Sequence, residues 1–205
     1  MKPLPALVWL SLWAGAAQGQ DCVLEGTLGA GVLSLNASGA DRAKLFEYRD
    51  VSSGALSLID LTACIASHTL KLYGENLGRD DAAIDLQGRY TRHHYRYQLY
   101  SDSLRHNFAF DARTPYSGAG SAQQSTTFPN LTPEGWTPVD VAYRRRKDGG
   151  ALEWAFSPQG YARLDASQTR VEGNKLQSYA QGTSPTQGFV DLVTPVDTTT
   201  KNFSL

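Results

Sequence analysis

The chain has 205 residues, with 19 Lys plus Arg and 20 Asp plus Glu, so its formal net charge is −1. This balance excludes the strongly basic surface that nucleic-acid binding requires, and we expect no nucleic-acid partner. Apolar residues make up 41% of the chain and charged residues 19%, which is typical of a folded globular protein. The length suits one domain, or at most two small ones.

Residues 1–19 are predicted to be a secretory signal peptide. Lys2 supplies the positive start, and the apolar stretch that follows is too short to cross a bilayer as a mature helix. Ala17 and Gly19 are small residues at the positions that signal peptidase reads, so we expect cleavage before Gln20. The alternative is an N-terminal membrane anchor.

The remainder, residues 20–205, is expected to form a single domain, because no change of composition marks a boundary. No other window is long or apolar enough to cross a membrane, so the sequence predicts a secreted protein without a membrane span.

Cys22 and Cys64 are the two cysteines of the chain. An even number of cysteines in an oxidising compartment predicts a disulfide, which would close a loop of roughly 40 residues and contribute about 3–4 kcal/mol. The alternative is a metal site, but this needs further ligands at close spacing, and no CxxC or HxxxH motif accompanies these cysteines. We therefore expect neither a metal nor a cofactor.

Alternation with a period of two dominates the exported part and predicts β-strands. In the clearest case Tyr95, Tyr97 and Leu99 lie on one face, and Arg96 and Gln98 lie on the other. The same alternation occurs at 68–73, 108–110, 139–143, 152–156 and 189–193.

The sequence Lys147-Asp148-Gly149-Gly150 separates two of these strands. Asp-Gly and Gly-Gly permit the positive φ angles of a tight hairpin turn, so we expect a hairpin between 139–143 and 152–156. Many short strands joined by turns predict an all-β protein with an antiparallel β-sandwich.

No catalytic motif is recognisable, and we expect the protein not to be an enzyme. There is no G-x-S-x-G nucleophile elbow. Asp102, Asp111, Glu134 and Glu153 are scattered along the chain. A pair of carboxylates for glycoside hydrolysis converges only in space, so a secreted hydrolase stays open as an alternative.

The densest cluster of charge is the run Arg144-Arg145-Arg146-Lys147. One interpretation is contact with an anionic surface, such as an acidic polysaccharide or lipid headgroups. The other is a solvated hairpin tip, whose charges discourage unwanted strand pairing.

Aromatic residues on expected loops form a candidate ligand site. Tyr116 and Trp136, with Glu134 nearby, are the candidate residues for binding a carbohydrate, because loop aromatics stack on sugar rings. The alternative is that these rings cover the open ends of the core.

The string HYRYQLYSDS at His94–Ser103 resembles the L-x-Y-x-L-Y-x-D segment of the spore coat protein U family, which includes subunits of archaic chaperone–usher pili of Gram-negative bacteria. The spacing of Cys22 and Cys64 and the sequence Gly-Glu-Asn at 74–76 also resemble that family. The sequence Gly-Phe-Val-Asp at 188–191 resembles the start of its last strand, and the patches together cover about half of the exported chain.

The resemblance implies an immunoglobulin-like β-sandwich that is incomplete and is completed by a donor strand from a periplasmic chaperone or a neighbouring pilus subunit. It implies a pilin-like or tip-adhesin-like protein, exported through the periplasm to the cell surface or a pilus, without catalytic residues. The alternative function is an autonomous carbohydrate-binding adhesin domain with a surface glycan as partner.

Three departures from the family pattern bear on this expectation. Residues 107–112 stand where the family has a W-G-D-G-like element, and 127–173 look like an insertion. Only Gln20 and Asp21 would precede Cys22 after cleavage, so a strand for donation is missing. The last departure points to a tip position rather than a shaft position.

Overall fold

The computed structural model describes residues 8–13, 22–34, 47–50, 52–126, 132–180 and 189–205. These residues form nine strands and one 3-10 turn, η1, at Pro133–Gly135. The strands are β1 Val8–Trp13, β2 Cys22–Leu33, β3 Gly54–Ile65, β4 His68–Glu75, β5 Ala83–Tyr90, β6 Tyr95–Thr114, β7 Thr137–Ser157, β8 Gly160–Ala180 and β9 Phe189–Ser204. No helix in this part of the chain has the length and hydropathy to cross a membrane.

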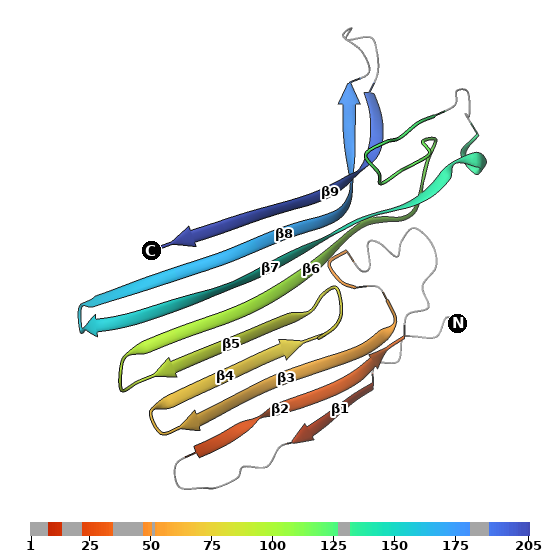
Figure 1. The fold of residues 1–205 in the computed structure, drawn as a ribbon. Helices are drawn as coiled ribbons and strands as arrows, with labels where there is room; N and C mark the ends of the chain where they lie inside the picture. The colour runs from red at the N-terminus through yellow and green to blue at the C-terminus, as the bar shows by residue number, and fades with distance from the viewer. Residues whose placement is uncertain (1–7, 14–21, 35–46, 51, 127–131, 181–188) are drawn as a thin grey trace.

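All nine strands belong to one sheet, in which each strand pairs antiparallel with its neighbours in chain order, from β1 to β9 (Figure 1). The strands differ in length. β4 and β5 have 8 residues each, whereas β6 has 20 and β7 and β8 have 21. The long strands therefore continue past the end of β4 and β5, and Figure 1 shows them bending away from the rest of the sheet.

The two ends of the sheet differ in their connections. At one end β3–β4, β5–β6 and β7–β8 are joined by the short segments 66–67, 91–94 and 158–159. At the other end the connections cover 34–53, 76–82, 115–136 and 181–188. The C-terminus lies at the end with the short turns (Figure 1).

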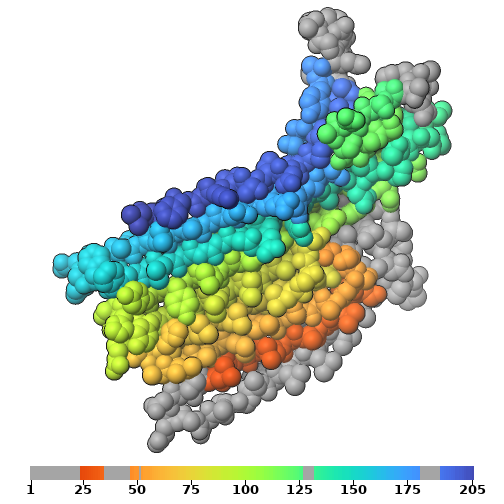
Figure 2. All heavy atoms as spheres, in the orientation of Figure 1, coloured from red at the N-terminus to blue at the C-terminus, as the bar shows by residue number. Residues whose placement is uncertain are grey.

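The predicted all-β, antiparallel class is confirmed, but the immunoglobulin-like sandwich is not. A sandwich buries the inner faces of two packed sheets. Here the described strands form a single sheet, and Figure 2 shows them side by side in chain order. Among the described residues only three apolar side chains are buried, and they are Phe110, Val141 and Val193.

The predicted strands occur, but the predicted hairpin at Asp148-Gly149-Gly150 is wrong, because these residues lie inside the continuous strand β7. A Cβ atom on Gly149 would lie 2.6 Å from the hydroxyl of Tyr100, and one on Gly150 would lie 2.8 Å from Cδ2 of Leu99. The two glycines let side chains of β6 lie across β7, as glycines in strands often do. They mark a close approach rather than a turn.

The strand β1 lies within residues 1–19, the predicted signal peptide, and pairs with β2. Pairing in the full-length chain does not test cleavage, so the signal peptide and the boundary of the single domain stay predictions.

Candidate functional site on the polar face of the sheet

One row of residues runs straight across the sheet and is apolar throughout. Directly opposed residues in antiparallel strands point to the same face, so the row defines one face, which we call the apolar face. Its members are Leu61 on β3, Leu72 on β4, Leu86 on β5, Leu99 on β6, Gly150 on β7, Ala166 on β8 and Phe203 on β9.

The apolar face is uncovered in the structure. The side chain of Leu99 is 56% exposed, that of Trp154 is 46% exposed and that of Phe203 is 73% exposed. Other exposed members of this face are Leu24, Leu28, Val32, Ile65, Ile84, Leu152, Phe156 and Leu164. An apolar surface of this breadth indicates contact with lipid or with another protein.

Aromatic rings lie at the end of the apolar face that is nearest the short turns. The rings of Tyr95 and Trp154 stack at 6.1 Å, and Phe156 meets Trp154 edge-on at 5.8 Å. His68 and Tyr90 form a further edge-on pair at 5.9 Å. Tyr and Trp have an apolar body and a polar tip, so they suit a boundary between an apolar layer and water.

The opposite face, which we call the polar face, carries a row of cations. Arg89 on β5 stands directly opposite Arg96 on β6, and the row continues through Glu153 on β7 to Arg163 on β8. Lys71 lies in the neighbouring row of the same face. We call these four cations, Lys71, Arg89, Arg96 and Arg163, the basic row.

The basic row lines a hollow of about 460 Å³, together with Gln87, Gln98 and Glu153. Glu153 contacts two of the cations at long range, Arg96 at 3.6 Å and Arg163 at 3.8 Å. Arg163 also pairs with Asp165 at 2.8 Å. In the described part of the chain, Lys71 and Arg89 form no ion pair. The hollow therefore holds more positive than negative charge.

Carboxylates occupy the polar face further toward the long connections. Asp60 and Asp85 lie in one row, and Glu75 and Asp102 lie in the next. Asp85 accepts hydrogen bonds from the side-chain amides of Gln87, at 2.7 Å, and Gln98. The polar face is thus divided into a basic part near the short turns and an acidic part beyond it.

On β6–β9 the side of the sheet that carries the apolar face becomes charged beyond the row of Leu99 and Phe203, toward the long connections. The first polar row is Ser101, Asp148, Gln168 and Lys201. We call the part of β6–β9 beyond this row the extension.

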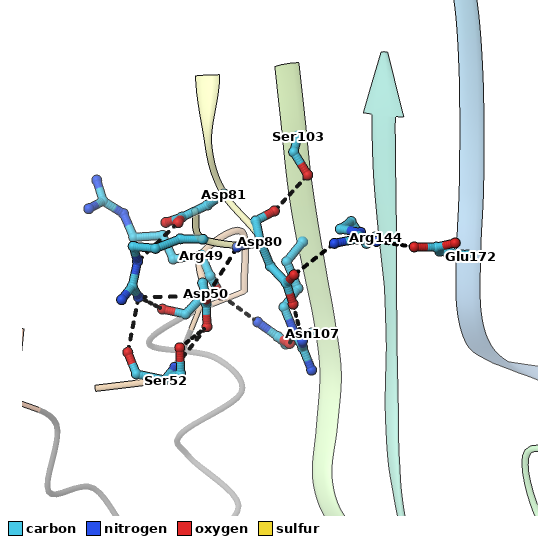
Figure 3. A network of polar contacts seen from close by, with 11 residues as sticks. Arg49, Asp50, Ser52, Asp80, Asp81, Ser103, Asn107, Arg144 and Glu172 are labelled. Carbon is cyan, nitrogen blue, oxygen red and sulfur yellow. Dashed lines mark hydrogen bonds and ion pairs between the residues drawn. The ribbon is translucent and has the colours of Figure 1, made fainter. Parts of the chain in front are cut away.

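In the extension Asp80, from the β4–β5 connection, accepts hydrogen bonds from Arg105 at 2.7 Å and Arg144 at 2.9 Å (Figure 3). Arg144 also pairs with Glu172, and the hydroxyl of Ser103 donates to the backbone oxygen of Asp80 at 2.8 Å. These contacts tie the β4–β5 connection to β6 and β7, and Arg144 in turn links β7 to β8.

Asp50 extends this network to the β2–β3 connection (Figure 3). Its carboxylate accepts hydrogen bonds from the backbone N–H and hydroxyl of Ser52, at 2.8 and 2.7 Å, and from the backbone N–H of Asp80 at 3.1 Å. Burial opposes ionisation of Asp50, but these hydrogen bonds and the charge of Arg79 outweigh it and lower the pKa of Asp50 below its usual value.

Residues 38–205, which are most of the chain, match the model of the family described as "Putative outer membrane beta-barrel porin, MtrB/PioB". The chain belongs to the MtrB/PioB family. No curated protein shows a significant match to it.

Membership of the MtrB/PioB family overturns the resemblance to the spore coat protein U family. The pilin-like or adhesin-like function, the chaperone and pilus partners, the surface glycan and the pilus location are wrong for the same reason. Strings such as HYRYQLYSDS at His94–Ser103 are alternating strand residues, which unrelated antiparallel sheets share. Predicted export through the periplasm agrees with an envelope protein of this family.

The predicted absence of a membrane span is also wrong for a family of outer membrane barrels. A search for long apolar windows detects membrane helices, which need about 20 consecutive apolar residues. A membrane strand needs only about 9–11 residues, and every second one faces the polar interior. The strand β3, with 12 residues, is long enough.

The structure brings two of the three predicted carbohydrate-binding residues together. Tyr116 and Trp136 both line a cavity of about 860 Å³ in the extension, alongside Val141 and Val193. Glu134 lies in η1 and does not line this cavity, although its backbone oxygen is 3.5 Å from Nη1 of Arg113. A role of these residues in ligand binding stays a prediction.

The predicted disulfide concerns strands that are neighbours in the sheet. Cys22 on β2 pairs with Ile65, one position from Cys64 on β3. Sγ of Cys64 lies 3.8 Å from Oγ1 of Thr69, and Cys64 has no disulfide partner among the described side chains. The side chain of Cys22 lies outside the described residues, so the pair stays a prediction that thiol titration of the unreduced, denatured protein can test.

The charged run Arg144-Arg145-Arg146-Lys147 lies in the middle of β7, so it is not a hairpin tip. Its members alternate between the two faces. Arg144 and Arg146 lie on one side of β7, where Arg144 pairs with Asp80 and Arg146 pairs with Asp148, each at 2.9 Å. Lys147 lies on the polar face, with Nζ 5.3 Å from the centre of the Tyr100 ring.

Reasoning from the sequence missed the basic row. The alternation at 95–99 does place Arg96 and Gln98 on a polar face. However, Arg89, Arg96 and Arg163 come from three strands, and only the register places them side by side.

Proposed function

We propose that the sheet forms part of the wall of an outer membrane β-barrel pore, with the apolar face toward lipid and the polar face lining a water-filled pathway for polar solutes. The observation that carries this proposal is the uncovered apolar row across β3–β9 with a charged face behind it. Membrane barrels have this arrangement, apolar outside and polar inside. This role requires no catalytic residue.

The two ends of the sheet give the orientation that we propose. Outer membrane barrels have short turns on the periplasmic side and longer loops outside the cell. The turns at 66–67, 91–94 and 158–159 then face the periplasm, and the extension projects outward. The aromatic residues near the short turns, among them Tyr95 and Trp154, then lie at the periplasmic membrane interface, where barrels carry aromatic girdles.

Closure of the barrel follows from the same physics. In lipid each unpaired backbone N–H or C=O group costs several kcal/mol, so the outer strands of the sheet need partners on both sides. Within the described residues β9 has one neighbour, and after the predicted cleavage before Gln20 the first strand, β2, has only β3 beside it. We propose that these edges are paired in the assembled barrel.

Adjacent residues of β6 allow a direct test. Leu99→Cys and Gln98→Cys, each in a background with Cys22→Ser and Cys64→Ser, are labelled with a fluorophore in lipid vesicles. We expect brominated lipid to quench the label at 99 and aqueous iodide to quench the label at 98. Equal quenching of both positions by iodide would refute the lipid-facing assignment.

Conductance tests the pore itself. The purified full-length protein in planar bilayers is expected to give ion conductance, and protein that inserts into vesicles without any conductance would count against a pathway.

A further inference from the structure

We infer that the basic row is a binding site for small multivalent oxyanions, such as phosphate, on the wall of the pathway. The inference rests on the proposed function only in placing this site near the periplasmic mouth of a pore. The site itself is built from the contacts and the register of five strands, β4 to β8, and from the charges that they carry.

The first argument is the direct opposition of Arg89 and Arg96. Like charges at directly opposed positions destabilise an antiparallel pair. No carboxylate lies between these two cations in their row, since the row passes from Arg89 to Arg96 and only then to Glu153. A bound anion would relieve this repulsion, which points to a binding role rather than a structural one.

The second argument is incomplete neutralisation within a concave surface. The hollow of about 460 Å³ is large enough for a hydrated phosphate ion. Of the charged side chains that line it, four are cations and one, Glu153, is an anion. Glu153 is shared between Arg96 and Arg163 at 3.6 and 3.8 Å, and Arg163 also donates two hydrogen bonds to Asp165. The donors left for another acceptor are therefore those of Lys71 and Arg89 and the remaining N–H groups of Arg96.

The third argument is the chemistry of the donors. Guanidinium groups present forked N–H donors that match the oxygens of phosphate or sulfate, and an ammonium group adds a compact charge. Gln87 and Gln98 lie directly opposite each other between Lys71 and Ala151 in the adjacent row, so neutral amides flank the cations. This set favours an oxyanion over a metal ion or an apolar ligand.

The segregation of charge on the polar face gives the site a direction. Asp60, Glu75, Asp85 and Asp102 lie beyond the basic row, toward the long connections. An anion that enters past the short turns meets the cations first and the carboxylates afterwards. The basic row is therefore expected to concentrate anions at its own end of the sheet.

The test measures binding of inorganic phosphate to the full-length protein in nanodiscs by titration calorimetry. Lys71→Gln and Arg89→Gln are each expected to weaken phosphate binding about tenfold, the effect of losing one charge-assisted hydrogen bond. Lys147→Gln is the matched control, because it removes the same charge from the same face at a position roughly 20 Å away. We expect it to change binding less than twofold.

Two further variants keep the result interpretable. Arg89→Lys retains the charge and is expected to restore part of the binding, which a mere folding defect in Arg89→Gln would not explain. Circular dichroism verifies that each variant keeps its sheet. Absence of phosphate binding by the wild type, or equal weakening by Lys147→Gln and Lys71→Gln, would overturn the inference.

Reversal potentials in planar bilayers under a potassium phosphate gradient separate this inference from the proposed function. Conductance without phosphate binding would overturn the site and leave the pore standing. Phosphate binding without conductance would overturn the pore and leave the site standing. With both intact, Lys71→Gln is expected to shift the reversal potential toward cation preference more than Lys147→Gln does.

Discussion

We call the part of the sheet between the short turns and the row of Ser101, Asp148, Gln168 and Lys201 the band. The band differs from the extension in where its apolar side chains point. In the band, Leu99 and Leu152 are exposed and the charged residues share the opposite face. In the extension, Val141 is buried on the side that continues the polar face, while Arg144 lies on the side that was apolar in the band. Strand β7 thus inverts its polarity along its length.

This inversion shows that alternation assigns side chains to faces but does not say what each face meets. In the band the apolar side suits lipid, as in other membrane barrels. In the extension the strands have passed beyond the proposed membrane, so the charged outer side of β7 meets water and the buried Val141 lies behind it. Substitutions in each region separate these two environments.

The largest effect is expected in the band. Leu99→Arg should destabilise the membrane-inserted protein by about 2–4 kcal/mol, the cost of a cation at the lipid face of a barrel. Asn202→Arg, on the polar face of β9 and away from the basic row, should change stability by less than about 0.5 kcal/mol. Urea unfolding in lipid vesicles measures both, and equal costs would remove the distinction between the faces.

In the extension, Val141→Ala should cost about 2 kcal/mol, because it removes two buried methyl groups and leaves a cavity. Val141 is 5% exposed, whereas Leu176 on β8 is 58% exposed and Leu176→Ala serves as the control. The loss should appear as greater protease sensitivity of the extension without loss of membrane insertion. Failure of Val141→Ala to insert would show that the two regions fold as one unit.

Asp50→Asn should cost about 1–2 kcal/mol, since it weakens the charge-assisted hydrogen bonds that hold the β2–β3 connection. The lowered pKa of Asp50 means that its contribution is complete above the unfolded value near 3.9 and fades as the pH falls through the folded value. Protease sensitivity of the loop at pH 3 and pH 7 measures it. The difference between the wild type and the variant should be smaller at the lower pH.

Trp154→Leu should cost about 1 kcal/mol, because it keeps an apolar side chain but removes ring contacts with Tyr95 and Phe156. Unfolding in vesicles is again the measurement, with Leu152→Ile as a control that leaves the aromatic cluster intact. A cost equal to that of the control would mean that the rings do not act as a cluster.

Arg146→Gln is expected to have the smallest effect, no more than about 0.5 kcal/mol. The side chains of Arg146 and Asp148 are 56% and 43% exposed, so water screens their ion pair. A cost above about 1 kcal/mol in lipid vesicles, absent in detergent, would instead place Arg146 against lipid headgroups.

The turn and strand signals show why some local predictions failed. Residues 139–143 and 152–156 are strands, as predicted, yet Asp148-Gly149-Gly150 between them is strand too. Glycine serves both a hairpin turn and the close approach of a neighbouring side chain. Tyr100, which approaches Gly149, is far away in the sequence, so the choice between the two could not be made locally.

The sequence by itself determined the all-β class and, in β4, β6, β7 and β9, strand segments with an apolar and a polar set, because the two-residue period of a strand is a local property. Only the tertiary structure decided that the apolar sets form one uncovered face and that Arg89, Arg96 and Arg163 stand in one row. Register joins residues that are distant in the chain. An apolar strand face that packs on a second sheet has the same alternation as one that meets lipid.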